Sequence, residues 1–336
     1  MNPRVSVLMA ARDAAGTIEA SLRSLQRQSL SDWEVLVVDD GSQDDTASRV
    51  QALVTQDPRI RLLRTSAKGV VAARNLAAEE ARGEAVAILD ADDLAHRLRL
   101  QLQWDQLQRQ GGGVVSCFAR YFRSEAVGPG LERYQQWLRR QDDGAAVQRA
   151  RFIEMPYAHS ALMLSYGLGE SVGWYQDYGW PEDYDLALRL AASGSSHGVV
   201  PRILVAWRVR EGSASRTEPR YSLSAFTRCR AAALARDYLT AENPWLLWGH
   251  GATGKALRQA LASHGYSPTA ILEVDSRKIG QRIEGIPVIN ALSWLNEDDA
   301  DHQLVVSVSG SIARQKIRES LASTGRIEGE GFFFAA

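Results

Sequence analysis

The chain has 336 residues, of which 45% are hydrophobic and 24% are charged, and its formal net charge is −1. This is an ordinary globular composition, with enough length and apolar content for about two domains. The 39 basic and 40 acidic residues nearly cancel, which excludes an overall basic protein built to bind nucleic acid.

Cysteine usage and hydropathy limit the cellular context. The two cysteines, Cys117 and Cys229, lie far apart and form neither a disulfide framework nor a zinc-binding spacing. The N-terminal apolar run is too short for a signal peptide, and no stretch approaches the roughly 20 apolar residues of a membrane span. We expect a cytoplasmic protein with reduced thiols; peripheral association with the inner face of a membrane stays open.

Strand-like and helix-like segments alternate over the first part of the chain. Strands are predicted at 4–11, 33–42, 60–65 and 85–93, with helices between them at 15–30, 44–57 and 70–83. Apolar residues in the first helix recur at near-helical spacing. This alternation predicts a parallel sheet with helices on both faces and with ligands at the carboxyl ends of the strands.

The middle of the chain is more mixed. Strands are predicted at 111–122, 159–164 and 203–209, and helices at about 125–151, 180–195 and 224–239. Pro181 suits the first turn of the helix at 180–195, and Glu182 and Asp183 favour its positive N-terminal end. A restart near Asn243 and Pro244 predicts two domains, at 1–238 and 243–336.

Carboxylates cluster where two predicted strands end. Asp39 and Asp40 follow one strand, and "DADD" places Asp90, Asp92 and Asp93 at the end of another. Mg²⁺ takes one or two carboxylates together with substrate phosphates and waters, and a D-x-D supplies two carboxylates. A lone D-x-D also fits a solvated acidic turn. Two such clusters at one edge of a sheet favour a metal site.

Three longer motifs follow one another in order. They are "VSVLMAARDAAGTIEASLRSLQRQSLSDWEVLVVDDGSQDDT", "KGVVAARNLAAEEARGEAVAILDADD" and "EDYDLALRL". Together they resemble the family 2 glycosyltransferases, over roughly residues 3–230. The resemblance implies an α/β protein of the GT-A fold, with a mixed, mainly parallel sheet. It also implies inverting transfer of a sugar from a nucleotide-diphosphate sugar to an acceptor hydroxyl, in the synthesis of cell-surface polysaccharide or another glycoconjugate.

The resemblance implies roles for individual residues. Asp40 matches the contact to the nucleotide base. Asp90 and Asp92 match the D-x-D that holds Mg²⁺ or Mn²⁺ on the diphosphate, with Asp93 as an alternative ligand. Asp183 matches the base that deprotonates the acceptor. The residues implied for substrate or nucleotide binding are Ala10, Asp39, Asp40, Lys68, Arg74, Asp90, His159, Glu182 and Arg208.

Several features fit either a functional or a structural role. Trp174, Tyr175, Tyr178 and Trp180 fit an acceptor platform, because sugars stack on aromatic rings, or core packing. His159 fits an acceptor or phosphate contact, or a structural histidine. The segment "WRVREGSASR" resembles a family loop that closes on the donor. The Q-x-x-R-W motif of processive polymerases is missing from the sequence, which favours addition of single sugars.

The C-terminal region contains a glycine-rich loop between a predicted strand and a predicted helix. In "WLLWGHGATGKALRQ", Gly249, Gly251 and Gly254 form G-x-G-x-x-G, and Asp275 ends the next strand, where a ribose-binding acid is expected. Through "DSRKIGQRIEGIPVI" the region also resembles the small Rossmann-like N-terminal domain of sugar acyltransferases. Ligand binding by this loop and a structural or partner-docking role both stay open.

Two other functions compete with the enzyme. A non-catalytic nucleotide-sugar scaffold or sensor would use the C-terminal domain as its active part, but the intact acidic set argues against it. A nucleotidyltransferase shares the sheet architecture, yet "AARDAAGT" after the first strand has only one Gly and one Arg. The sequence does not decide the donor, the acceptor (a glycan, a lipid-linked sugar or another glycoconjugate) or homo-oligomerisation.

Overall fold

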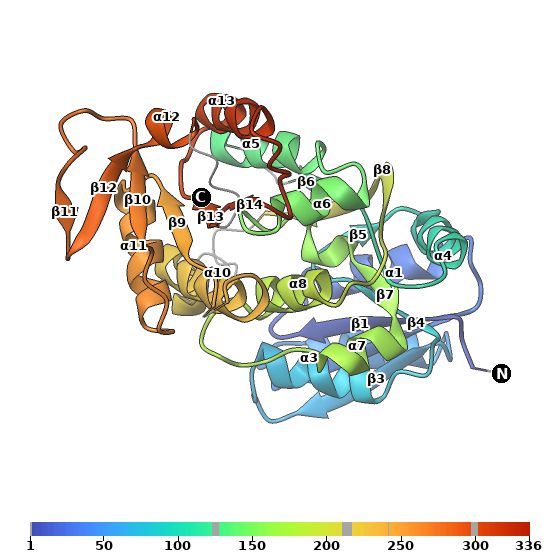
Figure 1. Cartoon of the computed structure of the whole chain (residues 1–336). Coiled ribbons are helices and arrows are strands. Elements are labelled where there is room, and N and C mark those ends of the chain that lie inside the picture. The colour runs from blue at the N-terminus through green and yellow to red at the C-terminus, as the bar shows by residue number, and fades with distance from the viewer. Residues whose placement is uncertain (1, 123–127, 210–216, 241, 297–301) are drawn as a thin grey trace. The chain divides into compact units, whose positions relative to one another are not determined.

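The computed structural model describes residues 2–122, 128–209, 217–240, 242–296 and 302–336. These residues form two compact units, each with its own sheet (Figure 1). The first unit comprises Met1–Val147, Pro156–Tyr178 and Arg189–Thr217, and the second comprises Gln148–Met155, Gly179–Leu188 and Glu218–Ala336. Each unit is therefore made of three separate segments of the chain.

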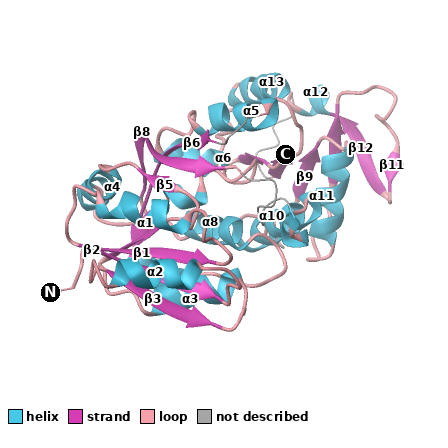
Figure 2. Ribbon diagram, turned by 180° about the vertical axis from the view of Figure 1, so that it is seen from behind, coloured by secondary structure: helices cyan, strands magenta, loops and turns pink. Residues whose placement is uncertain are grey.

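The first unit is built on a sheet with the strand order β3-β2-β1-β4-β7-β6-β8-β5. Figure 2 shows several of these strands from behind, among them β1, β2 and β3. Its strands are β1 (Val5–Ala11), β2 (Trp33–Asp40), β3 (Ile60–Thr65), β4 (Ala85–Ile88), β5 (Leu94–Ala95), β6 (Val114–Phe122), β7 (Met163–Ser165) and β8 (His197–Arg208). Strands β1 to β4 are parallel, whereas β7 and β5 run antiparallel to their neighbours. The expected mixed, mainly parallel sheet is confirmed.

Helices join these strands. They are α1 (Ile18–Gln26), α2 (Thr46–Val54), α3 (Val70–Glu79), α4 (Arg99–Arg109), α5 (Pro129–Leu138) and α7 (Tyr166–Val172), while α6 (Gly144–Ala150) and α8 (Glu182–Ala192) contain residues of both units. The strand expected at 159–164 is mostly a 3₁₀ turn at His159–Ala161, since a short apolar run cannot distinguish strand from helix. No helix within the described ranges is long and apolar enough to cross a membrane.

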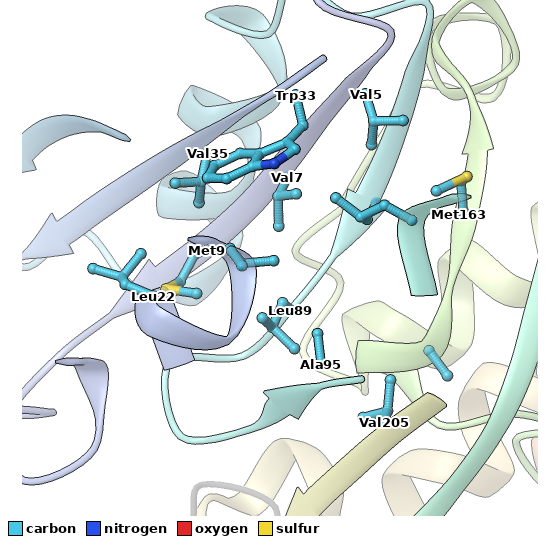
Figure 3. Close-up of a cluster of buried hydrophobic side chains, with 14 of the residues drawn as sticks. Val5, Val7, Met9, Leu22, Trp33, Val35, Leu89, Ala95, Met163 and Val205 are labelled. Atoms are coloured by element: carbon cyan, nitrogen blue, oxygen red, sulfur yellow. The ribbon is translucent and has the colours of Figure 1, made fainter. Parts of the chain in front are cut away.

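The core of the first unit explains the apolar runs in its sequence. All eight residues of β2 are buried, as expected for a parallel strand that is covered on both faces. Figure 3 shows part of one side of this core, where Val5 and Val7 of β1 lie near Trp33 and Val35 of β2. Leu22 of α1 belongs to the same apolar cluster. This packing brings the carboxyl ends of the parallel strands to one edge of the sheet.

The second unit has a sheet with the order β11-β12-β10-β9-β13-β14. Its strands are β9 (Trp245–Trp248), β10 (Ala270–Glu273), β11 (Arg282–Ile283), β12 (Ile286–Asn290), β13 (Gln303–Val306) and β14 (Phe332–Phe334). Its helices include α10 (Leu223–Asp237), α11 (Ala252–Ala262), α12 (Ala291–Trp294) and α13 (Ser311–Ala322). Strands β12, β10, β9, β13 and β14 are parallel, in the 3-2-1-4-5 order of a Rossmann-like domain.

Two earlier segments belong to the second unit. The ring of Phe152 packs edge-on against Phe333, with ring centroids 5.1 Å apart. The hydroxyl of Tyr184 donates to the carbonyl of Arg151, whose guanidinium lies 4.2 Å from the ring centroid of Phe333. The second sheet begins at Trp245, but the second unit also contains these two segments and residues 218–238, all of which the predicted first domain included. The boundary between 238 and 243 stays a prediction.

Candidate functional site

The acidic clusters of the first unit lie at one edge of its sheet. Ala11 of β1 pairs with Asp39 of β2, and Leu8 of β1 pairs with Ile88 at the end of β4. Because β1, β2 and β4 are parallel neighbours, the residues that follow them emerge side by side. Ala10 lies next to the end of β1 and is half-buried. The structure thus brings together the two clusters found in the sequence.

Asp40 is a structural anchor at this edge. Its Oδ1 accepts hydrogen bonds from the Thr65 hydroxyl and from the Lys68 backbone N–H at 2.7 Å, and its Oδ2 accepts from the Gly69 N–H at 2.8 Å. Burial alone would raise the pKa of Asp40, but the hydrogen bonds from Thr65, Gly69 and Lys68 outweigh burial and lower it. The carboxylate holds the turn before α3, and both of its oxygens are in use.

Replacing Asp40 with Asn is expected to lower the free energy of unfolding by about 1–3 kcal/mol, because one oxygen becomes an N–H₂ group that faces a donor. A carboxylate with a lowered folded-state pKa stabilises above its unfolded pKa of about 3.9, and that stability is lost as the pH falls through the folded value. The difference between wild type and variant, measured by urea denaturation, should therefore shrink below about pH 4. A difference that stays constant down to pH 2 would contradict this role.

Asp39 differs from its neighbour. It is 5% exposed, and its Oδ1 is buried without a hydrogen-bond partner among the described residues. A buried acceptor without a donor is costly, and such an atom in a native structure calls for an explanation. Since successive strand residues point to opposite faces, Asp39 and Asp40 cannot share one role. Asp39 carries the carboxylate oxygen that a ligand donor would satisfy.

The acidic turn after β4 is held by hydrogen bonds. The Asp93 N–H donates to the Asp90 carbonyl at 3.1 Å, and the Asp90 N–H donates to the Ser160 hydroxyl at 3.1 Å. Arg208 donates its backbone N–H to Asp93 Oδ1 at 2.8 Å and its Nε–H to the Asp92 carbonyl at 2.9 Å. Arg208 therefore orders the acidic turn through contacts that the sequence did not predict.

The carboxylates in this turn differ in environment. Asp93 is fully buried, and burial, together with the charges of Asp90 and Asp92, raises its pKa well above the ordinary value. Burial would also raise the pKa of Asp90, but the Arg74 guanidinium, 3.3 Å from Asp90 Oδ1, contributes to a net lowering. Asp92 is half-buried. Crowded like charges of this kind are relieved by a cation.

The residues of this turn can hold a divalent metal only with help from a substrate. No group of three His, Cys, Asp or Glu side chains suited to a metal occurs among the described residues. Mg²⁺ commonly binds through one or two carboxylates plus substrate phosphates. Asp90 and Asp92 fit such a partial set. The unpartnered Oδ2 of Asp93 is fully buried, which makes Asp93 the less accessible ligand.

A buried network lies beside Asp90. The Asn75 side chain forms two hydrogen bonds with the backbone of Tyr175, and the Tyr175 hydroxyl lies 2.9 Å from His159 Nε2. Burial, followed by the charge of Arg74, lowers the pKa of His159 to about 3. His159 is therefore neutral at pH 7 and offers no positive charge to a phosphate. This network ties Arg74 and the acidic turn to the interior.

Arg99 is a site residue that the sequence analysis missed. It is fully buried in α4, and its Nη2 donates to the carbonyls of Ile88 at 2.7 Å and Leu162 at 3.3 Å. Burial lowers the pKa of Arg99, and the charges of Asp93 and Asp90 oppose that shift. A charged residue among the apolar positions of a helix was the available signal. Arg99 supplies a buried positive charge beneath the acidic turn.

The other basic candidates make further contacts. The Lys68 side chain is exposed, and its backbone N–H makes the contact to Asp40. The guanidinium of Arg208 lies 4.5 Å from the ring centroid of Phe122. The loop residues Arg210, Ser213 and Ser215 lie outside the described residues.

Helix α8 presents its two first acids differently, within the second unit. Glu182 is fully buried and lies 3.7 Å from Arg220. Its two carboxylate oxygens, at 2.8 and 3.0 Å, share the single proton that the Tyr221 hydroxyl donates. Asp183 is half-buried, and its Oδ1 accepts the Tyr184 N–H at 2.8 Å. Glu182 anchors the start of the helix, and Asp183 carries the more accessible carboxylate.

The aromatic residues before α8 do not form a uniform platform. Tyr175 is 1% exposed and belongs to the core, whereas Tyr178 is 56% exposed. Trp174 and Trp180 are half-buried, and the Trp180 indole N–H donates to Asp185 at 3.3 Å. Tyr178 is the member of this set with the largest exposed ring surface.

The glycine-rich loop of the second unit connects β9 to α11, as expected. Gly249 follows β9 directly, Gly251 is the N-cap of α11, and Gly254 lies in its first turn. Asp275 lies two residues beyond the end of β10, and its carboxylate oxygens accept from Arg277 at 3.0 and 2.8 Å. This loop is built in another unit from the acidic turn.

A family comparison covers much of the first unit. Residues 6–166 match the family model described as Glycosyl transferase family 2. These residues form a glycosyltransferase family 2 domain. The domain contains β1, β2, β4 and the acidic turn, which are the elements that carry the first two sequence motifs.

Curated relatives match part of the chain. "UDP-Glc:alpha-D-GlcNAc-diphosphoundecaprenol beta-1,3-glucosyltransferase WfgD" of Escherichia coli is 43% identical over 101 residues, which are 29% of this chain and 39% of that protein. Glycosyltransferase GlyG of Streptococcus pneumoniae is 28% identical, over 34% of this chain and 38% of its own. The chain thus spans well under half the length of these relatives.

Solved structures share the fold. TarS 1–349 of S. aureus in complex with UDP-GlcNAc matches with a TM-score of 0.58 and 17% identity, covering 80% of this chain and 74% of that chain. The mannosyltransferase PcManGT of Pyrobaculum calidifontis in complex with GDP-Man and Mn²⁺ matches with a TM-score of 0.52 and 22% identity, covering 79% and 75%. The expected GT-A fold is confirmed.

Proposed function

We propose that the protein transfers a single sugar from a nucleotide-diphosphate sugar to an acceptor hydroxyl, with inversion at the anomeric carbon. The observation that carries this proposal is the acidic edge of the family 2 domain. There, Asp39, with its unpartnered carboxylate oxygen, lies at the end of β2, and the acidic turn follows β4; both strands are parallel to β1, which lies between them. One carboxylate for the base and others for the diphosphate are the groups that a nucleotide-sugar donor requires.

Asp39 is the residue that we assign to the nucleotide base. A base with a ring N–H, such as uracil, thymine or guanine, would supply the donor that Asp39 Oδ1 lacks. Asp40, the residue that the resemblance favours, has both oxygens engaged by the turn before α3. Its part in donor binding is therefore to shape the edge on which the base lies.

Asp90 and Asp92 are the carboxylates that we assign to Mg²⁺ or Mn²⁺. When bound with the donor, such an ion neutralises the charge of the leaving diphosphate. The chain's own contribution is to hold the acidic turn in place through Arg208 and Ser160. Arg74, already paired with Asp90, keeps that carboxylate oriented.

Asp183 is the group that we assign as general base. The acceptor O–H would give its proton to the Asp183 carboxylate as the acceptor oxygen bonds to the anomeric carbon and the bond to the diphosphate breaks. The N-terminal position of Asp183 on α8 favours the ionised carboxylate that such a base needs. This assignment rests on the E-D motif and on its greater exposure than Glu182.

The name of one relative supports an acceptor class. The E. coli relative is named for a lipid-linked acceptor, GlcNAc-diphosphoundecaprenol. We propose that this protein likewise extends a glycan, most simply a lipid-linked one, in the synthesis of cell-surface polysaccharide. Such an acceptor would bring the protein to a membrane surface.

A panel of donors tests the function. UDP-, GDP- and dTDP-sugars, each with Mn²⁺, should be compared by thermal shift on the whole chain, followed by transfer assays with the sugar that binds. A ligand at 100 times its Kd stabilises by about 2.7 kcal/mol, so one base should raise the melting temperature clearly. The Asp39→Asn variant should lose this shift and keep the melting temperature of the free protein. A chain that responds to every base equally, or to none, would contradict the proposal.

A further inference from the structure

The strand order of the second unit marks a second ligand-binding position. Strands β9 and β13 are adjacent and parallel, and the chain leads from β9 outward to β10 and β12, but from β13 outward to β14 on the other side. Open α/β sheets bind ligands outside the carboxyl ends of strands where the order reverses in this way. Here that point lies between the residues after β9 and the residues after β13.

The three glycines of the loop after β9 differ in whether the fold could accept a side chain at their positions. Gly249 has a φ of 93°, and a Cβ there would lie 2.7 Å from Val308 Cγ2. A Cβ on Gly254 would lie 2.2 Å from the Gly249 carbonyl oxygen, so the loop and the first turn of α11 pack too closely for a side chain. Gly251 has an ordinary φ of −76°, and its Cβ would meet no described atom within 4 Å. The fold requires the first and third glycines and leaves space above the second.

A buried hydroxyl lies beside this space. Ser307 follows β13 and is 5% exposed, and its Oγ has no hydrogen-bond partner among the described residues. The Ser307 Cβ is 3.5 Å from the position that a Cβ on Gly254 would take, so the side chain faces the first turn of α11. At the N-cap, Gly251 has no side chain to cap the α11 N–H groups. The uncapped N–H groups at the start of α11 and the unsatisfied Ser307 hydroxyl therefore lie close together.

The charges around the loop suit an anion. His250 Nε2 lies 3.2 Å from Nε of Arg258, and the His250 backbone N–H donates to Glu273. Burial, and then the charges of Arg258, Lys278 and Lys255, lower the pKa of His250, which places three cations around the loop. Glu273 balances Lys278 at 2.9 Å, and Glu284 balances Arg258 at 2.6 Å. Lys255 is exposed in the first turn of α11 and is the cation nearest in sequence to the uncapped N-terminus. A phosphate at the N-terminus of α11 would meet donors and a positive field.

We propose that the loop after β9 and Ser307 bind the diphosphate group of a nucleotide, as a second site apart from the donor site of the family 2 domain. The N–H groups of the first turn of α11 and the Ser307 hydroxyl would donate to phosphate oxygens. Glu273 ends β10, the strand next to β9, whereas Asp275 lies farther along and is held by Arg277. Glu273 is therefore the acid that we assign to a ribose hydroxyl, in place of Asp275.

Hydrogen–deuterium exchange on the full chain tests this site by location. UDP, ADP, NAD⁺ and inorganic pyrophosphate should each be added at saturating concentration. At least one nucleotide should slow exchange in peptides that cover 249–257 and 303–309, and the four probes separate a nucleoside diphosphate from a dinucleotide. Slowed exchange confined to the family 2 domain, or protection by pyrophosphate but by no nucleotide, would overturn the proposal.

Two variants separate binding from folding. Gly251→Asp adds a favourable N-cap and a negative charge, so it should preserve or raise the melting temperature while abolishing protection of the loop. Its matched control is Gly128→Asp at the N-cap of α5, where a Cβ also meets no described atom within 4 Å; this variant should keep the protection. Ser307→Ala should weaken nucleotide binding roughly tenfold without lowering the melting temperature of the free protein. Full protection in Gly251→Asp, or unchanged affinity in Ser307→Ala, would refute the site.

Discussion

Replacing Asp183 with Asn is expected to lower the rate of sugar transfer by about 10²–10⁴-fold, because an amide cannot take the proton of the acceptor hydroxyl. Asn keeps the shape of the side chain and the oxygen that accepts the Tyr184 N–H, so the start of α8 should stay intact. Initial rates at saturating donor measure the effect. Calorimetry on Asp183→Asn should give the same donor affinity as the wild type. Turnover at the wild-type rate would remove Asp183 from the role of base.

Glu182→Gln is the matched comparison, since it changes the neighbouring acid on the same helix. Glu182 is fully buried between Tyr221 and Arg220. Loss of its charge should lower the free energy of unfolding by about 1–3 kcal/mol. The two variants should therefore differ in what they lose: Asp183→Asn should lose turnover, and Glu182→Gln should lose stability. If Asp183→Asn instead lost as much stability as Glu182→Gln, its loss of activity would have a structural cause.

Asp92→Ala is expected to abolish metal-dependent donor binding. The contact of Arg208 to this residue uses the backbone carbonyl of Asp92, which Ala retains, so the acidic turn should keep its shape. In the wild type, EDTA should weaken binding of the nucleoside diphosphate that the donor panel selects by at least about tenfold, which corresponds to about 1.4 kcal/mol. In Asp92→Ala, EDTA should have no further effect.

Asp142→Ala controls for the loss of one negative charge from the family 2 domain's unit, because Asp142 is exposed. This variant should respond to EDTA as the wild type does. Binding by Asp92→Ala that stays fully sensitive to EDTA would show that other residues hold the metal. Nucleotide binding by the wild type that is insensitive to EDTA would remove the metal from the proposal altogether.

The parallel part of the sheet was predictable because its strands are buried on both faces. Such strands appear as continuous apolar runs, and the acids at the end of β2 and after β4 interrupt those runs abruptly. The position of both clusters at one edge follows from parallel pairing alone. The short strand β7 was harder, since three residues in Met163–Ser165 carry almost no periodic signal.

The division of roles within the site could not be predicted. Asp39 and Asp40 are adjacent carboxylates, and their difference depends on Thr65, Lys68 and Gly69, which lie 25 to 29 residues further along the chain. Only the folded structure shows that the donors of the turn before α3 engage both carboxylate oxygens of Asp40. It also shows that one oxygen of Asp39 is left unpartnered among the described residues.

Arg99 illustrates a different limit. In sequence it is a charged residue among the apolar positions of a helix, and its hydrogen-bond partners are the carbonyls at positions 88 and 162. Local periodicity cannot reveal a buried charge whose hydrogen-bond acceptors lie on two other segments. Its Coulombic partners, Asp93 and Asp90, become visible only when the acidic turn is placed above α4.

The packing of Phe152 against Phe333 has a consequence for synthesis of the protein. These rings meet within one compact unit although about 180 residues separate them in the chain. At about 5–20 residues per second, a ribosome needs roughly 10–40 s to make the second partner after the first. During that interval the first aromatic ring lacks its partner, so this unit completes its core only after residue 333 is made, and a chaperone that shields exposed aromatic residues would have time to act.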